Sequence, residues 1–277
     1  MIDAHQHYWN PSRGDYGWMP PDDPVLSRLY APVDLAKHLA TTGVTQTVLV
    51  QAAPSIAETD YLLGIADAAP NVAKVVGWIE FEDPSQREVL ARFAQHPKFA
   101  GVRPMIQDIE NDTWMLRDDV QWAYEVLIEL DLTFDCLGFP RHLPHFHNLL
   151  TRYPDLRAVI DHCMKPQVRA PSDENFATWS EGMSALAEDT NACCKLSGLV
   201  TEADDDWSDA RLRPYTDHVI KAFGHDRVMW GSDWPVARLR CEYPDWHAQA
   251  LRLISRFGDA AKLSVFNDTA QQFYRIT

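Results

Sequence analysis

The sequence predicts an α/β protein, a (β/α)8 TIM barrel formed as a single domain over residues 1–277. Short apolar segments recur along the chain, and each is followed by an amphipathic stretch. Several of these segments are rich in Val and Ile and do not alternate with polar residues, as is typical of parallel strands buried on both faces. About eight such units in 277 residues match the usual size of a TIM barrel.

An open, doubly wound sheet is the alternative architecture. It would usually carry a glycine-rich phosphate loop after a strand. The chain has only 12 glycines and contains neither GxGxxG nor GxxxxGK. The barrel is therefore the favoured prediction.

The apolar segments and their flanking residues give the expected order of elements. Strands are expected at Ile2–His7, Thr45–Gln51, Lys74–Ile79, Phe99–Arg103, Thr133–Cys136, Arg157–Asp161, Cys193–Leu196 and Arg227–Trp230. Helices are expected at Pro32–Thr42, Glu58–Ala69, Ser85–Gln95, Asp118–Leu130, Leu143–Arg152, Asn175–Glu188, Pro214–Phe223, Trp246–Arg256 and Ala260–Tyr274. Gly43, Pro70, Pro97 and Pro154 follow four of these helices as stop signals.

Composition limits the kinds of partner. The formal net charge is −15 and the sequence shows no run of Lys or Arg, so nucleic acid is excluded as a partner. No apolar run approaches the length of a membrane span, and no signal peptide is visible. Five cysteines without regular spacing predict reduced thiols. We expect a cytoplasmic protein that acts on a small molecule, and the oligomeric state stays open.

Three polar residues near the two ends of the chain carry the first functional prediction. His5 and His7 alternate with Gln6 on the first strand, so their side chains point to the same face. Asp233 follows the last strand. Because closure of a barrel makes the first and eighth strands neighbours, these three residues are expected to meet. Paired imidazoles beside a carboxylate suit hydrolytic chemistry, either directly or around a divalent metal ion.

Other chemically useful side chains end the middle strands, where the active site of a barrel lies. They are Arg103 after the fourth strand, Asp161 and His162 after the sixth, and Lys195 and Ser197 at the seventh. Charged groups at the ends of apolar strands require partners, because burying an unpaired charge is costly.

These segments together resemble the amidohydrolase superfamily and, within it, the sugar-lactone hydrolase branch. That branch includes enzymes of the L-fuconolactonase and L-rhamnonolactonase type and is related to 2-pyrone-4,6-dicarboxylate lactonase. The resembling segments occur in the family's order along nearly the whole chain and are residues 3–9 (DAHQHYW), 101–103 (GVR), 161–166 (DHCMKP), 195–199 (KLSGL) and 230–235 (WGSDWP).

The resemblance implies specific roles. Asp233 would be the general base on water, His5, His7 and His162 would be the other catalytic residues, and Arg103 with His162 would polarise the carbonyl. Many relatives have a metal-bridging side chain where this sequence has Arg103, and arginine does not ligate metals. The reaction is therefore expected to need no cofactor, and a bound zinc or manganese ion would be held by His5, His7 and Asp233.

The expected activity is hydrolysis of a sugar lactone, such as L-fuconolactone or L-rhamnonolactone, to the sugar acid. Lys195, Trp9 and Trp207 are the further substrate-binding residues expected, with Trp18 as another candidate ring. The alternatives are a metal-dependent decarboxylase of an aromatic carboxylic acid from the same superfamily, and a non-catalytic barrel that binds sugar acids.

Overall fold

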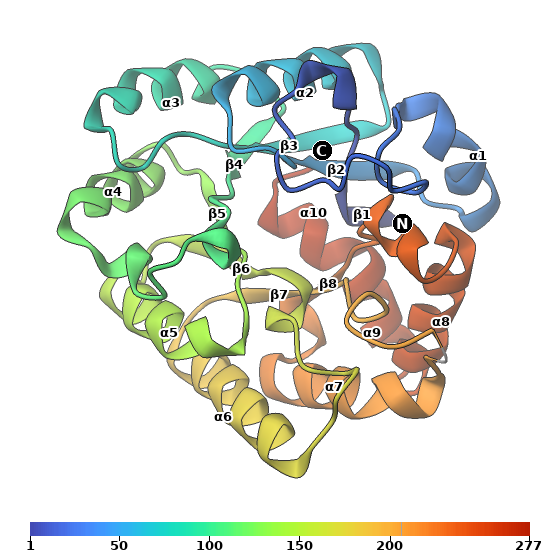
Figure 1. The fold of residues 1–277 in the computed structure, drawn as a ribbon. Coiled ribbons are helices and arrows are strands. Elements are labelled where there is room, and N and C mark those ends of the chain that lie inside the picture. The colour runs from blue at the N-terminus through green and yellow to red at the C-terminus, as the bar shows by residue number, and fades with distance from the viewer. Residues whose placement is uncertain (206) are drawn as a thin grey trace.

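The computed structural model describes residues 1–205 and 207–277 and forms a barrel of eight parallel strands (Figure 1). Neighbouring strands pair in sequence order from β1 to β8. A parallel bridge between Gln6 and Trp234 joins the ends of the sheet. The predicted (β/α)8 barrel is confirmed, and its form is consistent with a single domain.

The strands match their predicted positions within two residues at each end. They are β1 (Ile2–Gln6), β2 (Gln46–Val50), β3 (Val72–Gly77), β4 (Phe99–Val102), β5 (Thr133–Cys136), β6 (Arg157–Ile160), β7 (Cys193–Leu196) and β8 (Val228–Trp230).

Most of the helices connect successive strands around the outside of the barrel, and the last three follow β8 (Figure 1). The helices are α1 (Pro32–Thr42), α2 (Ile56–Ala68), α3 (Arg87–Ala94), α4 (Gln121–Glu129), α5 (Leu143–Arg152), α6 (Asp173–Asp189), α7 (Asp209–Phe223), α8 (Tyr243–Ser255), α9 (Asp259–Leu263) and α10 (Thr269–Phe273). A π-helical turn, Ser264–Asp268, joins α9 to α10 within the predicted last helix. Among the described residues, no helix has both the length and the apolar character needed to cross a bilayer.

The start of helix α7 differs from the prediction. Its start was expected at Pro214, but the helix begins at Asp209 and contains Pro214. The buried face of α7 includes both Leu212 and Tyr215, on either side of the proline. Burial of this continuous apolar face outweighs the backbone hydrogen bond that a proline inside a helix forfeits.

Local signals explain the better-predicted helices. Pro32 stands at the first turn of α1, where its missing N–H has no intrahelical partner to lose. Asp34 accepts a hydrogen bond from the backbone N–H of Ala31 at 2.9 Å and so caps the same turn. Gly43 ends α1 with φ of 73°, a left-handed conformation that glycine adopts without steric cost.

The inside of the barrel is closed from below by the end of the chain. Ala270, Tyr274 and Ile276 pack against the inward-facing apolar residues of the strands, among them Ile2 and Val48. This leaves the carboxyl ends of the strands as the open end, which is where barrels of this kind place their functional groups.

Gly101 on β4 gives a stability prediction. A Cβ atom there would lie 2.1 Å from the backbone oxygen of Thr133 on β5, whereas a Cβ at Gly64 on α2 would meet nothing within 4 Å. We expect Gly101→Ala to lower the free energy of unfolding by at least about 2 kcal/mol because the strands must separate. Gly64→Ala should raise it by about 0.5 to 1 kcal/mol. Chemical denaturation of both variants measures this, and equal stability of the two would refute the steric explanation.

Candidate active site

A cavity opens at the carboxyl ends of the strands, with an empty volume of about 540 Å³ that is in contact with solvent. The residues lining it are His7, Trp9, Trp18, Ala52, Arg103, Met105, Gln107, Leu137, His162, Lys165, Asp233 and Val236.

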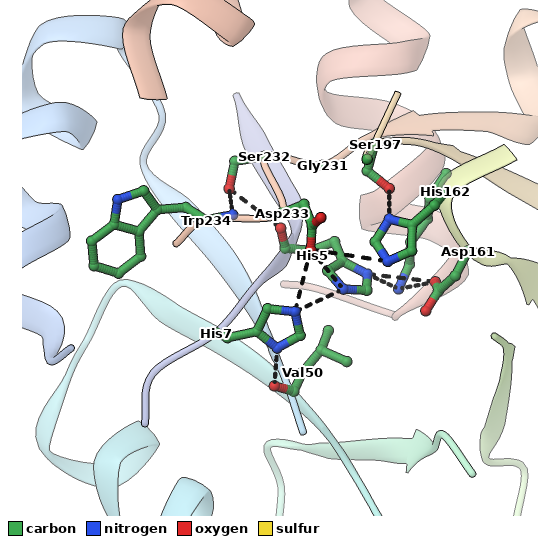
Figure 2. A network of polar contacts seen from close by, with 12 residues as sticks. His5, His7, Val50, Asp161, His162, Ser197, Gly231, Ser232, Asp233 and Trp234 are labelled. Carbon is green, nitrogen blue, oxygen red and sulfur yellow. Dashed lines mark hydrogen bonds and ion pairs between the residues drawn. The ribbon is translucent and has the colours of Figure 1, made fainter. Parts of the chain in front are cut away.

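His5 and His7 lie side by side, as the alternation along β1 predicts (Figure 2). Their Nε2 atoms are 3.2 Å apart. Nδ1 of His7 is 2.8 Å from the backbone oxygen of Val50, which can only accept, so Nδ1 carries the proton of the neutral ring. The Nε2 lone pair of His7 therefore points toward His5 and Asp233.

Asp233 faces the histidines from the other end of the chain (Figure 2). Its Oδ1 atom is 3.4 Å from Nε2 of His7, 3.8 Å from Nε2 of His5 and 3.9 Å from Nε2 of His162. Asp233 has φ of 56°, and its backbone N–H donates to the oxygen of His5 at 2.8 Å. The left-handed backbone of Asp233 is thus fixed against β1.

Burial sets the protonation states of this group. It lowers the pKa of His162 to about 4 and is also the main cause that lowers the pKa of His5 and of His7. All three imidazoles are therefore neutral at pH 7. Burial alone would raise the pKa of Asp233, but its interactions with His162 and His7 outweigh burial and hold that pKa below the usual range. Asp233 is an ionised carboxylate among neutral rings.

His162 begins a strained turn after β6. Residues 162 to 165 all have φ between 48° and 57°, so four successive residues are left-handed. Left-handed backbone is unfavourable for each of these residues, and such strain is found mostly at functional sites. Nδ1 of His162 is 2.9 Å from Oγ of Ser197, and a Cβ at Gly198 would lie 2.8 Å from the His162 ring. Ser197 and Gly198 thus hold the ring against the cavity.

Arg103 enters the cavity from the end of β4. Its Nη1 atom is 3.2 Å from Oδ2 of Asp161 and 3.3 Å from Nε2 of His5. Its Nη2 atom donates to the backbone oxygen of Gln51. The guanidinium is therefore both paired and oriented, and it is 4% exposed at the cavity wall.

Lys195 was expected to bind substrate at the cavity, but it lies elsewhere. The side chain is fully buried and is not one of the described residues that line the cavity. Its Nζ atom is 2.5 Å from Oδ2 of Asp135, 3.0 Å from Oδ1 of Asp161 and 3.1 Å from Nδ1 of His5. Tyr274 donates to Asp135 from below at 3.1 Å. This ion cluster lies beneath the histidines, so Lys195 has no access to a substrate in the cavity.

The tryptophans differ in their relation to the cavity. Trp9 lines it but has no exposed surface, and its Nε1 donates to the oxygen of Leu26 at 3.0 Å. Trp18 is 38% exposed at the cavity and donates to the oxygen of Ala52 at 2.6 Å. Trp207 is absent from the described lining, and its nearest indole partner is the oxygen of Arg240 at 3.5 Å.

Sequence reasoning assigned no role to several residues that the fold brings to the site. Lys165 occurred in the sequence analysis only as part of the segment 161–166, without a role of its own. Gln107 lies on a short 3-10 turn, and no sequence pattern indicated that it would line the cavity. Asp135 looked like one polar residue of an apolar strand. Its role appears only in three dimensions, because its partner Lys195 lies two strands away around the barrel.

The chemistry of the donors fits one divalent ion. Ligand atoms of His5, His7 and Asp233 lie within 4.8 Å of one another, and two imidazoles with a carboxylate form a common zinc set. The proton on Nδ1 of His7 leaves Nε2 free to ligate. Arg103, which lies 3.3 Å from Nε2 of His5, would repel a cation there and weaken its binding.

The pattern of the amidohydrolase family matches residues 2–276. The chain belongs to this family. It is 41% identical to an L-fucono-1,5-lactonase from Burkholderia ambifaria, with 99% of this chain and 95% of the relative covered. A second L-fucono-1,5-lactonase, from Burkholderia multivorans, is 34% identical over 99% of this chain and 96% of its own length.

Solved structures agree with this family membership. A crystal structure of an amidohydrolase from Burkholderia multivorans with bound zinc has a TM-score of 0.93 and 32% identity, covering 100% of this chain and 99% of that one. A 5-carboxyvanillate decarboxylase from Novosphingobium aromaticivorans, complexed with manganese, has a TM-score of 0.69 at 15% identity, with 99% and 96% covered. The second similarity shows a shared fold alone.

The buried ion cluster gives a second stability prediction. Lys195→Met would leave Asp135 and Asp161 without their common cation, so we expect the free energy of unfolding to fall by about 3 to 5 kcal/mol. Adding Asp135→Asn should restore part of the loss, because one uncompensated carboxylate is removed. Lys37→Met, at an exposed position on α1, should change stability by less than about 0.5 kcal/mol. Denaturant titration compares the three, and wild-type stability of Lys195→Met would contradict the cluster's role.

Proposed function

We propose that the chain is a hydrolase that opens the ring of a sugar lactone to give the sugar acid. The observation that carries the proposal is the ionised Asp233 carboxylate in one cavity with the Arg103 cation and the neutral His162 ring. A base and carbonyl-polarising donors in one small cavity are the parts that ester hydrolysis needs. The whole-length similarity to the two L-fucono-1,5-lactonases supports the same substrate class.

Polarisation of the lactone carbonyl falls to Arg103 and His162. Arg103 stays protonated throughout and can donate to the oxygen on which negative charge develops. If the Ser197 hydroxyl donates to Nδ1 of His162, Nε2 of that ring carries the proton and donates into the cavity. Both donors are held in place before substrate arrives, which is what makes such stabilisation effective.

Asp233 acts on the attacking water. Its carboxylate accepts one proton as the water oxygen forms a bond to the carbonyl carbon, giving a tetrahedral intermediate. When the intermediate collapses, the bond from that carbon to the ring oxygen breaks. The proton returns from Asp233, directly or through a histidine, to the departing oxygen, and the products are a hydroxyl group and a carboxylic acid on one open chain.

The remaining candidate roles follow from the cavity. His5 orients the Asp233 carboxylate: Lys195 donates to its Nδ1, so its Nε2 carries the proton and faces both Nε2 of His7 and Oδ1 of Asp233. Nε2 of His7 has no proton and is an acceptor beside the same carboxylate. L-Fucono-1,5-lactone is the first substrate to test and L-rhamnonolactone the second. Trp18 offers an accessible apolar ring face, whereas Trp9 has no exposed surface and supports the cavity wall.

A metal ion would be bound by His5, His7 and Asp233, where it would supply Lewis-acid polarisation of a carbonyl or of water. We propose that ring opening does not depend on it, because Arg103 already supplies a fixed positive charge beside His5. The acidic surface, with a net charge of −15, favours a small neutral substrate over a nucleic acid. We also place the protein in the cytoplasm.

Decarboxylation of an aromatic acid is the weaker candidate, because its support is a shared fold at 15% identity. Carbon dioxide release from hydroxybenzoates would reveal it. Binding of sugar acids without turnover would favour a non-catalytic barrel, which has no need of an ionised base inside its cavity.

Replacement of the base tests the mechanism. Asp233→Asn keeps the shape of the side chain but removes its ability to take a proton, so we expect kcat on L-fucono-1,5-lactone to fall at least about 100-fold. A pH-indicator assay follows the acid that ring opening releases. Asp245→Asn, on the exposed side of α8, is the matched control and should retain full activity. Near-full turnover by Asp233→Asn would remove Asp233 as the base.

Metal removal tests the cofactor proposal. We expect protein that has been treated with a chelator and shown by elemental analysis to be free of zinc and manganese to keep at least about half of its turnover, since Arg103 needs no ion to polarise the carbonyl. The same preparation is assayed again after addition of each ion. A large loss that zinc or manganese reverses would show that the reaction requires a metal.

A further inference from the structure

The two sides of the cavity differ in chemistry. Trp9 and Trp18, from the segment after β1, line it together with Ala52, which follows β2. Lys165 and Gln107 line it from the segments after β6 and β4. Nζ of Lys165 donates to Oε1 of Gln107 at 2.5 Å, so these two segments are bridged at the cavity wall.

Lys165 keeps hydrogen-bonding capacity after this contact. An ammonium group has three protons, and Gln107 takes one of them. Within residues 1–205 and 207–277, no carboxylate pairs with Lys165 at 4.0 Å or less; its ammonium lies 5.4 Å from the Phe139 ring, and its charge acts at longer range on Glu202. The cavity therefore contains a cation whose remaining protons have no protein acceptor within the described structure.

The strained turn explains how Lys165 reaches the cavity. Tight helical turns place residues three apart on the same side. His162 and Lys165 are three apart and both line the cavity, whereas Cys163 and Met164 between them are fully buried in the core. The left-handed backbone from 162 to 165 thus aims the polarising histidine and this lysine into the same space.

We propose that Lys165, held in place by Gln107, donates a hydrogen bond to a ring hydroxyl group of the sugar lactone and so recognises it. The inference rests on the proposed lactone hydrolysis and adds to it the group that selects hydroxylated substrates. An ammonium donates and cannot accept, so its partner is a hydroxyl oxygen on the edge of the ring. The apolar face of the same ring would then lie toward Trp18, which matches the two chemistries of a sugar ring to the two sides of the cavity.

A pair of substrates isolates this role. L-Fucono-1,5-lactone and δ-valerolactone share a six-membered lactone ring, but only the first has ring hydroxyl groups. The ratio of their kcat/KM values therefore reports hydroxyl recognition apart from ester chemistry. For Lys165→Met, which keeps the length of the side chain and removes its charge, we expect that ratio to fall at least about tenfold, mainly through KM for the sugar lactone.

Two further variants control the result. Gln107→Leu should lower the ratio in the same direction by a smaller factor, because Lys165 loses its support but not its charge. Lys221→Met, at an exposed position on α7, should leave the ratio unchanged. Thermal unfolding shows whether each variant is folded, and if Lys165→Met is not, then Gln107→Leu decides.

An unchanged ratio in a folded Lys165→Met or, failing that, in Gln107→Leu would overturn the inference. So would an equal loss on both lactones, which would indicate a general effect on the site. If the wild-type protein opens no lactone, the proposed function fails on its own. Calorimetric titration of the wild type and Lys165→Met with the intact sugar lactone then tests the inference, and equal affinity of the two proteins would refute it.

Discussion

Contact between the first and last strands is the constraint on which the site depends. The backbone N–H of Asp233 donates to His5 at 2.8 Å, that of His7 donates to Trp234 at 2.7 Å, and that of Ser232 donates to the Asp3 carboxylate at 2.8 Å. Closure of a barrel satisfies backbone groups that an open sheet would leave at its edges. The same bonds place a carboxylate from the end of the chain against imidazoles from its beginning (Figure 2).

Electrostatics beneath the cavity support this arrangement. Burial opposes ionisation of Asp161, but the Lys195 ammonium together with the interactions of Asp161 with His5 and His162 outweighs burial and holds the pKa of Asp161 well below its usual range. Asp161 in turn pairs with Arg103 at 3.2 Å. Through Asp161, the buried Lys195 thereby orients Arg103, the cation that faces the cavity. Positioning through such supporting contacts is how a site keeps its geometry with little motion.

Local patterns predicted the elements well. Strands buried on both faces are continuous apolar runs, and helices are bounded by glycine and proline, so both can be recognised in the sequence. The strand Cys193–Leu196 and the helix Leu143–Arg152 were predicted to the residue. Prediction failed where tertiary contacts override local signals. His142 stands in a polar segment just before the helix Leu143–Arg152, yet its side chain is fully buried, and its Nδ1 accepts from the N–H of Phe139. No local pattern distinguishes such a capping histidine from an exposed one.

The sequence by itself determined the barrel and the convergence of His5, His7 and Asp233. These follow from residue periodicity and from chain order, which are local properties. Only the tertiary structure decided which polar residues face the cavity. Lys195 was expected to face it and is buried beneath it, whereas Lys165 lines it. The direction of a side chain at a strand end depends on the turn that follows and on neighbouring strands, and neither is encoded in the spacing of residues.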